Sequence, residues 1–264
     1  MEKWKKSVVH LKCFHSDDYI SLGAGLFVKE ETTRANKTKN IQYFIITAKH
    51  VVLDNSGKLY SYVGEINRYA NAIEEQEVLM YKLDESLKDY RSHYEPVMLS
   101  KDDVTDLAAI SLNSPVTEDF LKYLLRQGYE PIDISEFENS DVVEGDEILS
   151  IGFPNGSDIE MLLRNNTDNI NSLPVFSFGK VAMNHQDLVF FLGDLSNHEG
   201  NSGGPVVKDN KVIGIVSSQP ARKYRVLGSS NREIEIDIRY PLALIIKSKE
   251  VLRIIQHLKM NFWD

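Results

Sequence analysis

The chain is poor in cysteine and has no long apolar run. Cys13 is the single cysteine among 264 residues, so no disulfide can form within the chain. Small secreted proteins often depend on such bridges. No apolar run approaches the ~20 residues of a membrane-spanning helix, and no apolar signal core follows the N-terminal lysines. These absences predict a cytoplasmic protein with no membrane partner.

The chain also lacks a surplus of positive charge. Its formal net charge is −9 at pH 7. Binding to nucleic-acid phosphates requires clustered lysine and arginine. The acidic balance therefore excludes nucleic acid as the main partner, while it leaves other classes of function open.

Most of the sequence is typical of short strands separated by turns. Apolar and β-branched residues gather in short runs bounded by glycine, proline and asparagine, a pattern that favours sandwiches or barrels. Strands are predicted at 9–13, 23–28, 43–47, 107–112, 147–151, 189–192, 205–207, 212–217 and 233–238. Two amphipathic helices are predicted at 118–127 and 249–259.

Ser202 lies in a glycine-rich motif that suits a nucleophile. The motif is Glu-Gly-Asn-Ser-Gly-Gly-Pro at 199–205. A serine hydroxyl needs an adjacent base and donors for the oxyanion. Flanking glycines allow a sharp turn and leave main-chain amides open to a substrate oxygen. The amides of Gly200 and Ser202 are the candidate donors. An ordinary glycine-rich turn between strands is the structural alternative.

A histidine and an aspartate lie where strands end or begin. His50 follows the apolar strand 43–47, and Asp106 precedes the apolar strand 107–112. A histidine at a cleft can act as general base, and a carboxylate can fix its tautomer. A partly buried histidine and a turn aspartate are the alternatives. Asp102 and Asp103 compete with Asp106, although their polar surroundings favour a solvated position.

The three motifs together resemble those of trypsin/chymotrypsin-like serine peptidases. Ile-Thr-Ala-Lys-His-Val around His50, Asp-Leu-Ala-Ala-Ile from Asp106 and Gly-Asn-Ser-Gly-Gly-Pro around Ser202 occur in the order His, Asp, Ser, which is the chymotrypsin order. The stretch 145–156 also resembles a turn of bacterial Deg-type and glutamyl-endopeptidase-type relatives. The resemblance runs from about residue 7 to 257.

The resemblance implies an all-β fold of two antiparallel six-stranded β-barrels. A single peptidase domain over 1–264 would comprise a first barrel at 7–120 with His50 and Asp106 and a second at 140–246 with Ser202. A C-terminal helix would follow at 248–259, with a short helix inserted between the barrels. The site would lie in the cleft between them.

The resemblance also implies a pocket for the substrate side chain. Its base would be formed by Ser196, Asn197 and His198, and its wall by Val216, Ser217, Ser218 and Gln219. Ser196 stands where trypsins carry an aspartate, and Val216 stands where glutamyl relatives carry a histidine. A small or polar side chain in the substrate is therefore the prediction. Asn201 replaces the aspartate that receives the new N-terminus in animal trypsins, so activation by N-terminal clipping is not expected.

The prediction is a serine endopeptidase that is regulated and narrow in substrate. It would act on a protein or peptide, with an activating or regulatory protein partner. An analogy with bacterial relatives suggests a stress or phage-defence pathway. A silent protein-binding scaffold and an esterase with the same triad are the alternatives. No cofactor and no metal are expected, because the spacing of His10, Cys13 and His15 does not form a metal site.

Overall fold

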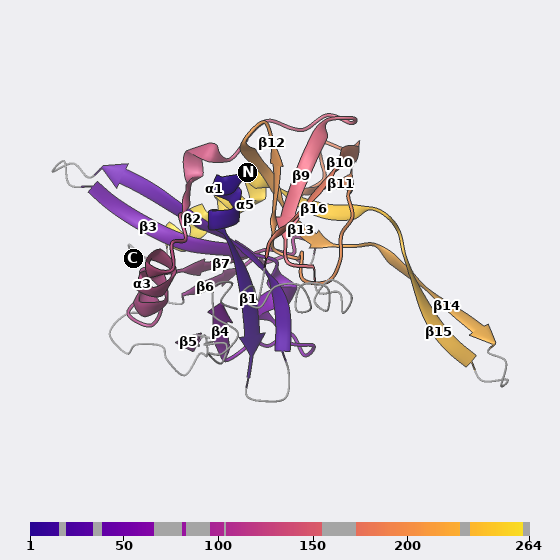
Figure 1. Cartoon of the computed structure of the whole chain (residues 1–264), viewed down its shortest axis with the longest axis horizontal. Coiled ribbons are helices and arrows are strands. Elements are labelled where there is room, and N and C mark those ends of the chain that lie inside the picture. The colour runs from indigo at the N-terminus through magenta and orange to yellow at the C-terminus, as the bar shows by residue number, and fades with distance from the viewer. Residues whose placement is uncertain are drawn as a thin grey trace.

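The computed structural model of the protein describes residues 1–15, 20–33, 39–65, 81–82, 96–102, 104–154, 173–227 and 233–260. Two β-structures pack side by side, and a two-stranded arm projects from one of them (Figure 1). The predicted all-β fold is confirmed.

The first β-structure is a curled sheet. Its strands follow the order β5-β4-β1-β2-β3-β7-β6, with β8 beside β2. Among the described strands this sheet is not closed, so it differs from the six-stranded barrel expected there. Its strands are β1 (Val8–Phe14), β2 (Ile20–Thr33), β3 (Lys39–Thr47), β4 (Tyr62–Glu65), β5 (Tyr81–Lys82), β6 (Val97–Leu99), β7 (Ala108–Ser111) and β8 (Ile132–Asp133).

The second β-structure is a closed six-stranded barrel, as expected. Its order is β10-β11-β16-β13-β12-β9. Its strands are β9 (Glu147–Gly152), β10 (Val175–Asn184), β11 (Phe190–Asp194), β12 (Pro205–Lys208), β13 (Lys211–Ser218) and β16 (Ala243–Lys247). Closure leaves no sheet edge exposed where it holds. The arm consists of β14 (Ala221–Leu227) and β15 (Glu233–Arg239).

The helices are short and lie outside the two β-structures. They are α1 (Glu2–Ser7), α2 (Lys49–Val52), α3 (Glu118–Arg126), the 3₁₀ turn η2 (Ile134–Glu136) and α5 (Ser248–Met260). Both predicted helices are present, as α3 and α5. Within the described residues, none of the helices combines the length and the apolar character that crossing a bilayer requires.

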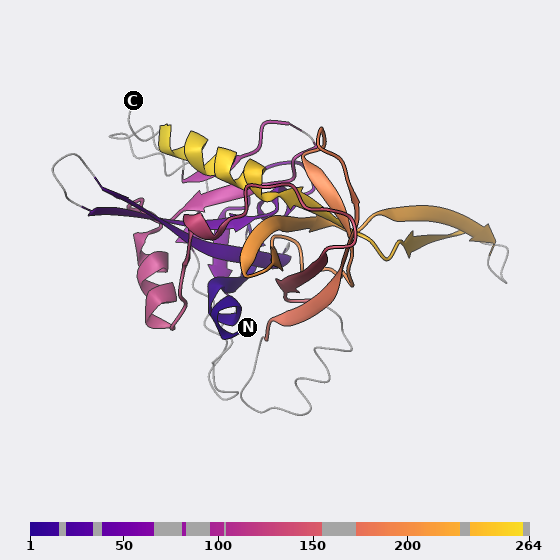
Figure 2. The same cartoon turned by 90° about the horizontal axis from the view of Figure 1, so that it is seen from above.

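One hydrophobic core joins the two β-structures. It contains Leu26 of β2, Ile151 of β9 and Ile215 of β13, together with Val251 and Ile255 of α5. The helix α5 leaves the barrel at β16 and packs against β13 and β7 (Figure 2). Burial of apolar side chains from both sides of the interface opposes relative movement of the two structures, because separation would expose them to water.

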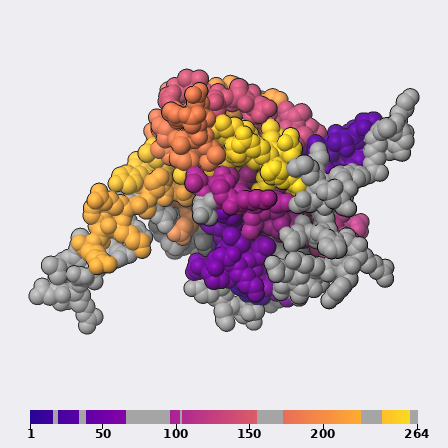
Figure 3. Space-filling view, turned by 180° about the vertical axis from the view of Figure 1, so that it is seen from behind, coloured from indigo at the N-terminus to yellow at the C-terminus, as the bar shows by residue number. Residues whose placement is uncertain are grey.

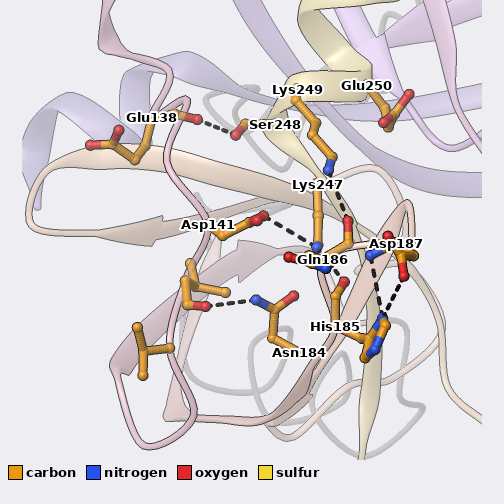
Figure 4. Close-up of polar contacts among 12 residues, drawn as sticks. Glu138, Asp141, Asn184, His185, Gln186, Asp187, Lys247, Ser248, Lys249 and Glu250 are labelled. Carbon is orange, nitrogen blue, oxygen red and sulfur yellow. Dashed lines mark hydrogen bonds and ion pairs between the residues drawn. The ribbon is translucent and has the colours of Figure 1, made fainter.

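Buried polar groups hold α3 and α5 in place. The hydroxyls of Tyr123 and Tyr129 donate to the two oxygens of the buried Glu65 carboxylate, at 2.9 and 2.6 Å. At the start of α5, the buried ammonium of Lys247 donates to Asp141 at 3.2 Å and to the carbonyl of His185 at 2.8 Å (Figure 4). These contacts satisfy charges that would be costly to bury alone.

Candidate active site

The loop that carries Ser202 is fixed by its main chain. The carbonyl of Ser202 accepts a hydrogen bond from the amide of Ala24 in β2 at 2.7 Å, so the loop from the barrel reaches the first sheet. The amide of Gly203 donates to the carbonyl of Val216 at 2.8 Å. Gly203 has a φ of +88°, and a Cβ there would lie 2.0 Å from the Ala24 carbonyl oxygen. Only glycine fits this position without displacement of the backbone.

His50 is held by two hydrogen bonds with one carboxylate. It lies in α2, directly after β3, and Asp106 directly precedes the buried Leu107 and β7, so the pairing of β3 with β7 brings the two together. Nδ1 of His50 lies 2.7 Å from Oδ2 of Asp106, and the His50 amide donates to Oδ1 at 3.0 Å. The His50 side chain is 51% exposed and the Asp106 side chain 19%. The carboxylate thus fixes a ring that remains accessible to a substrate.

Ser217 links the Asp106 carboxylate to Ser202. Its hydroxyl donates to Oδ2 of Asp106 at 2.7 Å, and its carbonyl accepts from the Ser202 hydroxyl at 2.9 Å. Burial by itself raises the pKa of Asp106. The hydrogen bonds from His50 and Ser217 and the nearby imidazole outweigh burial and hold that pKa below its ordinary value. The sequence placed Ser217 in the pocket wall; its contact with Asp106 could not be read from the chain.

In the resting site, the Ser202 hydroxyl is bonded to Ser217 rather than to His50. Ser202 and His50 share no hydrogen bond in the described part of the chain. Rotation about the Cα–Cβ bond of Ser202 moves its oxygen between staggered positions at no covalent cost. Catalytic hydrogen bonds of unliganded sites commonly form only when substrate binds.

The turn before Ser202 leaves two amides open. The amide of Asn201 donates to the carbonyl of His198 at 3.1 Å, and Gly200 has a φ of +90°. A hydrogen bond of this kind with positive φ at the third residue is the mark of a type II turn. The amides of Gly200 and Ser202 have no acceptor among the described residues. They are therefore available to an oxygen of a substrate.

An open hollow of about 510 Å³ lies beside His50. The residues around it all belong to the first β-structure and the segments that follow its strands. They are Ile20, Ser21, Lys49, His50, Leu53, Asp54, Asn55, Gly57, Tyr60 and Asp106. Asp54 at this hollow has a lowered pKa, because Ser56, Lys58 and His15 donate hydrogen bonds to it.

The competing aspartates have other surroundings. Oδ1 of Asp102 accepts hydrogen bonds from the amides of Val104 and Thr105, at 3.0 and 2.5 Å. This carboxylate therefore stabilises the turn that contains it. Asp103 lies outside the described residues. Of the two that the structure describes, Asp102 and Asp106, Asp106 is the one whose carboxylate contacts His50.

The chain matches one family model over residues 23–215, the trypsin-like peptidase domain. It belongs to the trypsin-like peptidase family. The matched range contains all three motifs and covers most of the chain. Members of this family are hydrolases, so the protein is a serine peptidase. None of the curated proteins compared with the chain matches it significantly.

Solved structures with the same fold include two crystal structures of Rv3671c. The first is an inactive-form mutant of Rv3671c from M. tuberculosis H37Rv, 11% identical, with a TM-score of 0.50; the match covers 98% of this chain and 90% of that one. The second is the inactive form of the Rv3671c protease, 12% identical, with a TM-score of 0.50 and coverage of 97% and 91%. At this identity the likeness concerns the chymotrypsin-like fold alone.

The predicted pocket residues of this trypsin-like chain have mixed surroundings. The Ser196 hydroxyl lies 3.1 Å from Nε2 of His198, and Asn197 is buried. The Val216 side chain packs in the barrel core, so it does not face a substrate. Ser218 is exposed, and the Gln219 amide donates to the carbonyl of Tyr240 at 2.7 Å. A role in specificity for these residues stays a prediction.

The three residues considered for a metal have other partners. The ring of His10 stacks on Phe153 with centroids 4.5 Å apart. Burial raises the pKa of the Cys13 thiol to about 12. His15 lies 2.8 Å from Asp54 through Nε2. Within the part of the chain that the structure describes, no cluster of metal-ligating side chains is present.

Proposed function

We propose that the protein is an endopeptidase in which Ser202 is the nucleophile, His50 the general base and Asp106 the group that orients His50. The observation that carries this proposal is the pair of hydrogen bonds between His50 and Asp106, with the third bond from Ser217. Together they fix the imidazole with Nδ1 toward the carboxylate, so that Nε2 is left to accept a proton.

The proposed reaction begins with rotation of the Ser202 hydroxyl from Ser217 toward His50. As the Ser202 oxygen bonds to the carbonyl carbon of the substrate, its proton passes to Nε2 of His50. The negative oxygen of the tetrahedral intermediate accepts hydrogen bonds from the amides of Gly200 and Ser202. The C–N bond then breaks, and His50 returns the proton to the leaving amine. Water, activated by His50 in the same way, hydrolyses the acyl-enzyme.

The preference for a small or polar substrate side chain stays part of this proposal. Ser196, Asn197 and His198 supply no carboxylate at the predicted base of the pocket. A lysine or arginine side chain would therefore lack a counter-charge there. Neutral side chains would lose less on leaving water.

Restraint by a protein partner is also proposed, and the resting hydrogen bond of Ser202 to Ser217 supports it. A partner that favours the rotated hydroxyl would raise activity by shifting the population of the two positions. A cytoplasmic setting and a bacterial stress or phage-defence pathway stay predictions.

Labelling with a fluorophosphonate, followed by intact mass, tests the proposed triad. Wild type should gain one adduct, Ser202→Ala should gain none, and His50→Ala should react at least about 100-fold more slowly because the base is lost. Ser140→Ala, at an exposed serine outside the site, is the matched control and should react like wild type. Labelling of Ser202→Ala would contradict the assignment of Ser202 as the nucleophile. No labelling of wild type would contradict the proposed triad and favour a silent scaffold.

Turnover of an amide separates a peptidase from an esterase. A peptide bond and an activated ester should both be hydrolysed by wild type, and neither by Ser202→Ala. Hydrolysis of the ester alone, across a denatured peptide library, would favour the esterase.

A further inference from the structure

The β14–β15 hairpin stands clear of the body of the molecule. Figures 1 and 2 show it leaving the barrel end of the protein, and Figure 3 shows it from behind. Each of its strands has seven residues, and residues 221–225 of β14 are exposed. In the described part of the chain, β14 and β15 pair only with each other.

The arm continues two strands of the barrel. β13 leads through Gln219 and Pro220 into β14, and β15 leads back through Tyr240 into β16. β13 also pairs with β16, up to Ser218 opposite Leu244. The amide of Tyr240 donates to the carbonyl of Pro220 at 2.9 Å, which bridges the junction. The arm and these barrel strands therefore form one long ribbon.

One edge of this ribbon begins at the nucleophile. β12 pairs with β13 only as far as Ile215, and the Ser202 loop takes the positions opposite Val216 and Ser217. Beyond that point, no described strand pairs with this edge of β13 or with the outer edge of β14. Among the described strands, this edge therefore has no neighbour from Ser202 along the arm.

A long edge that has no neighbouring strand among the described residues is a template for another extended chain. Natural edges are commonly short or protected by charges that point inward. β14 has seven residues, and residues 221–225 are exposed, so this edge is neither short nor buried.

We propose that the arm binds the substrate polypeptide as an added β-strand, on the acyl side of the bond that is cleaved. This inference rests on the proposed function. His50, which protonates the leaving amine, belongs to the first β-structure, so the leaving half of the substrate lies on that side. The acyl half then lies along β13 and continues onto β14. Seven residues of β14 span roughly 23 Å, so the arm recognises an extended, unfolded segment well before the cleaved bond.

A peptide series tests the arm. A denatured peptide library is first digested by wild type to find a preferred site, read by mass spectrometry. A peptide with about twelve residues on the acyl side of that site is then compared with one that keeps three. Wild type should show a kcat/KM about tenfold higher for the long peptide. In an arm-less variant, residues 222–238 are replaced by Asn-Gly to form a two-residue turn. There the ratio of the two kcat/KM values should fall below about two, and the loss should appear as a higher KM for the long peptide.

The matched control shortens another projecting hairpin. Replacement of residues 32–40 by Asn-Gly closes β2 and β3 at the pair Glu31 and Ile41, at the end of the molecule away from the arm (Figure 2). This variant should keep the tenfold ratio. A truncation of the peptide on its leaving side should affect wild type and the arm-less variant equally.

The outcomes separate the two proposals. If wild type and the arm-less variant are both labelled by fluorophosphonate and keep the same ratio, the arm proposal is wrong and the triad stands. If wild type is not labelled, both fail. If wild type is labelled but cleaves nothing in the denatured library, the arm proposal is also overturned, because such a library consists of extended chains.

Discussion

The two β-structures position their parts of the site by different means. The closed barrel presents Ser202 on a loop whose main chain admits only glycine at 203. The curled sheet presents His50 through hydrogen bonds of side chains, with Asp106 as the common acceptor. The half with Ser202 therefore depends on backbone sterics, and the half with His50 depends on electrostatics. Changes in the first half should affect folding, and changes in the second should affect chemistry.

The largest expected effect is on chemistry, in the variant Asp106→Asn. The amide keeps the shape of the carboxylate but can donate to Nδ1 of His50, which favours the wrong tautomer. We expect the rate of peptide hydrolysis to fall by about 10³–10⁴-fold, together with a loss of about 1–3 kcal/mol in the free energy of unfolding, because the hydrogen bonds to a charged acceptor are weakened. A peptide-hydrolysis assay measures the rate, and calorimetry measures the stability. A fall of less than tenfold would mean that the carboxylate does not act through His50.

Gly203→Ala should break the other half by destabilising the fold. Its Cβ would meet the Ala24 carbonyl oxygen at 2.0 Å and Thr47 Oγ1 at 2.2 Å, at a φ of +88°. We expect a loss of about 3 kcal/mol or more in the free energy of unfolding. Gly57→Ala is the matched control, since Gly57 also has a positive φ but nothing within 4 Å; there we expect about 1 kcal/mol. Equal losses, measured in urea, would contradict the steric explanation.

Glu65→Gln should destabilise the first β-structure without changing the chemistry. The buried carboxylate accepts from Tyr123 and Tyr129, and hydrogen bonds to a charged group are worth more than those to a neutral amide. We expect a loss of about 1–3 kcal/mol in unfolding free energy. The rate of fluorophosphonate labelling should stay within about twofold of wild type. A large fall in labelling would show that α3 supports the site directly.

Ser217→Ala should have the smallest effect and should depend on pH. Loss of the hydroxyl raises the pKa of Asp106 toward its ordinary value. A lowered pKa in the folded state contributes stability above the unfolded pKa of about 3.9, and that contribution is lost as pH falls through the folded pKa. We expect wild type to exceed the variant by about 1 kcal/mol at pH 7 and by less near pH 3. Urea unfolding at both pH values measures this difference, and a gap that widens in acid would contradict it.

Local patterns predicted many elements but missed others. The predicted strands at 9–13, 43–47 and 212–217 are present in β1, β3 and β13, because their apolar residues are buried, with half-buried positions between them in β1 and continuously at 44–47 and 212–217. β10 and β14 were not predicted. In β10, one residue, Val181, is buried, and exposed residues of β14 give no apolar signal. Strands that are stabilised by pairing rather than by burial have few buried apolar residues, so an apolar pattern in the sequence does not predict them.

The sequence by itself determined the three motifs, their order and hence the family. Such motifs carry their signal locally, since glycine around Ser202 is required by the turn that contains it. The tertiary structure alone decided that Ser217 bridges Asp106 and Ser202, and that the arm prolongs the edge beside Ser202. Each of these depends on strand pairing between segments far apart in the chain, and residue spacing carries no information about that pairing.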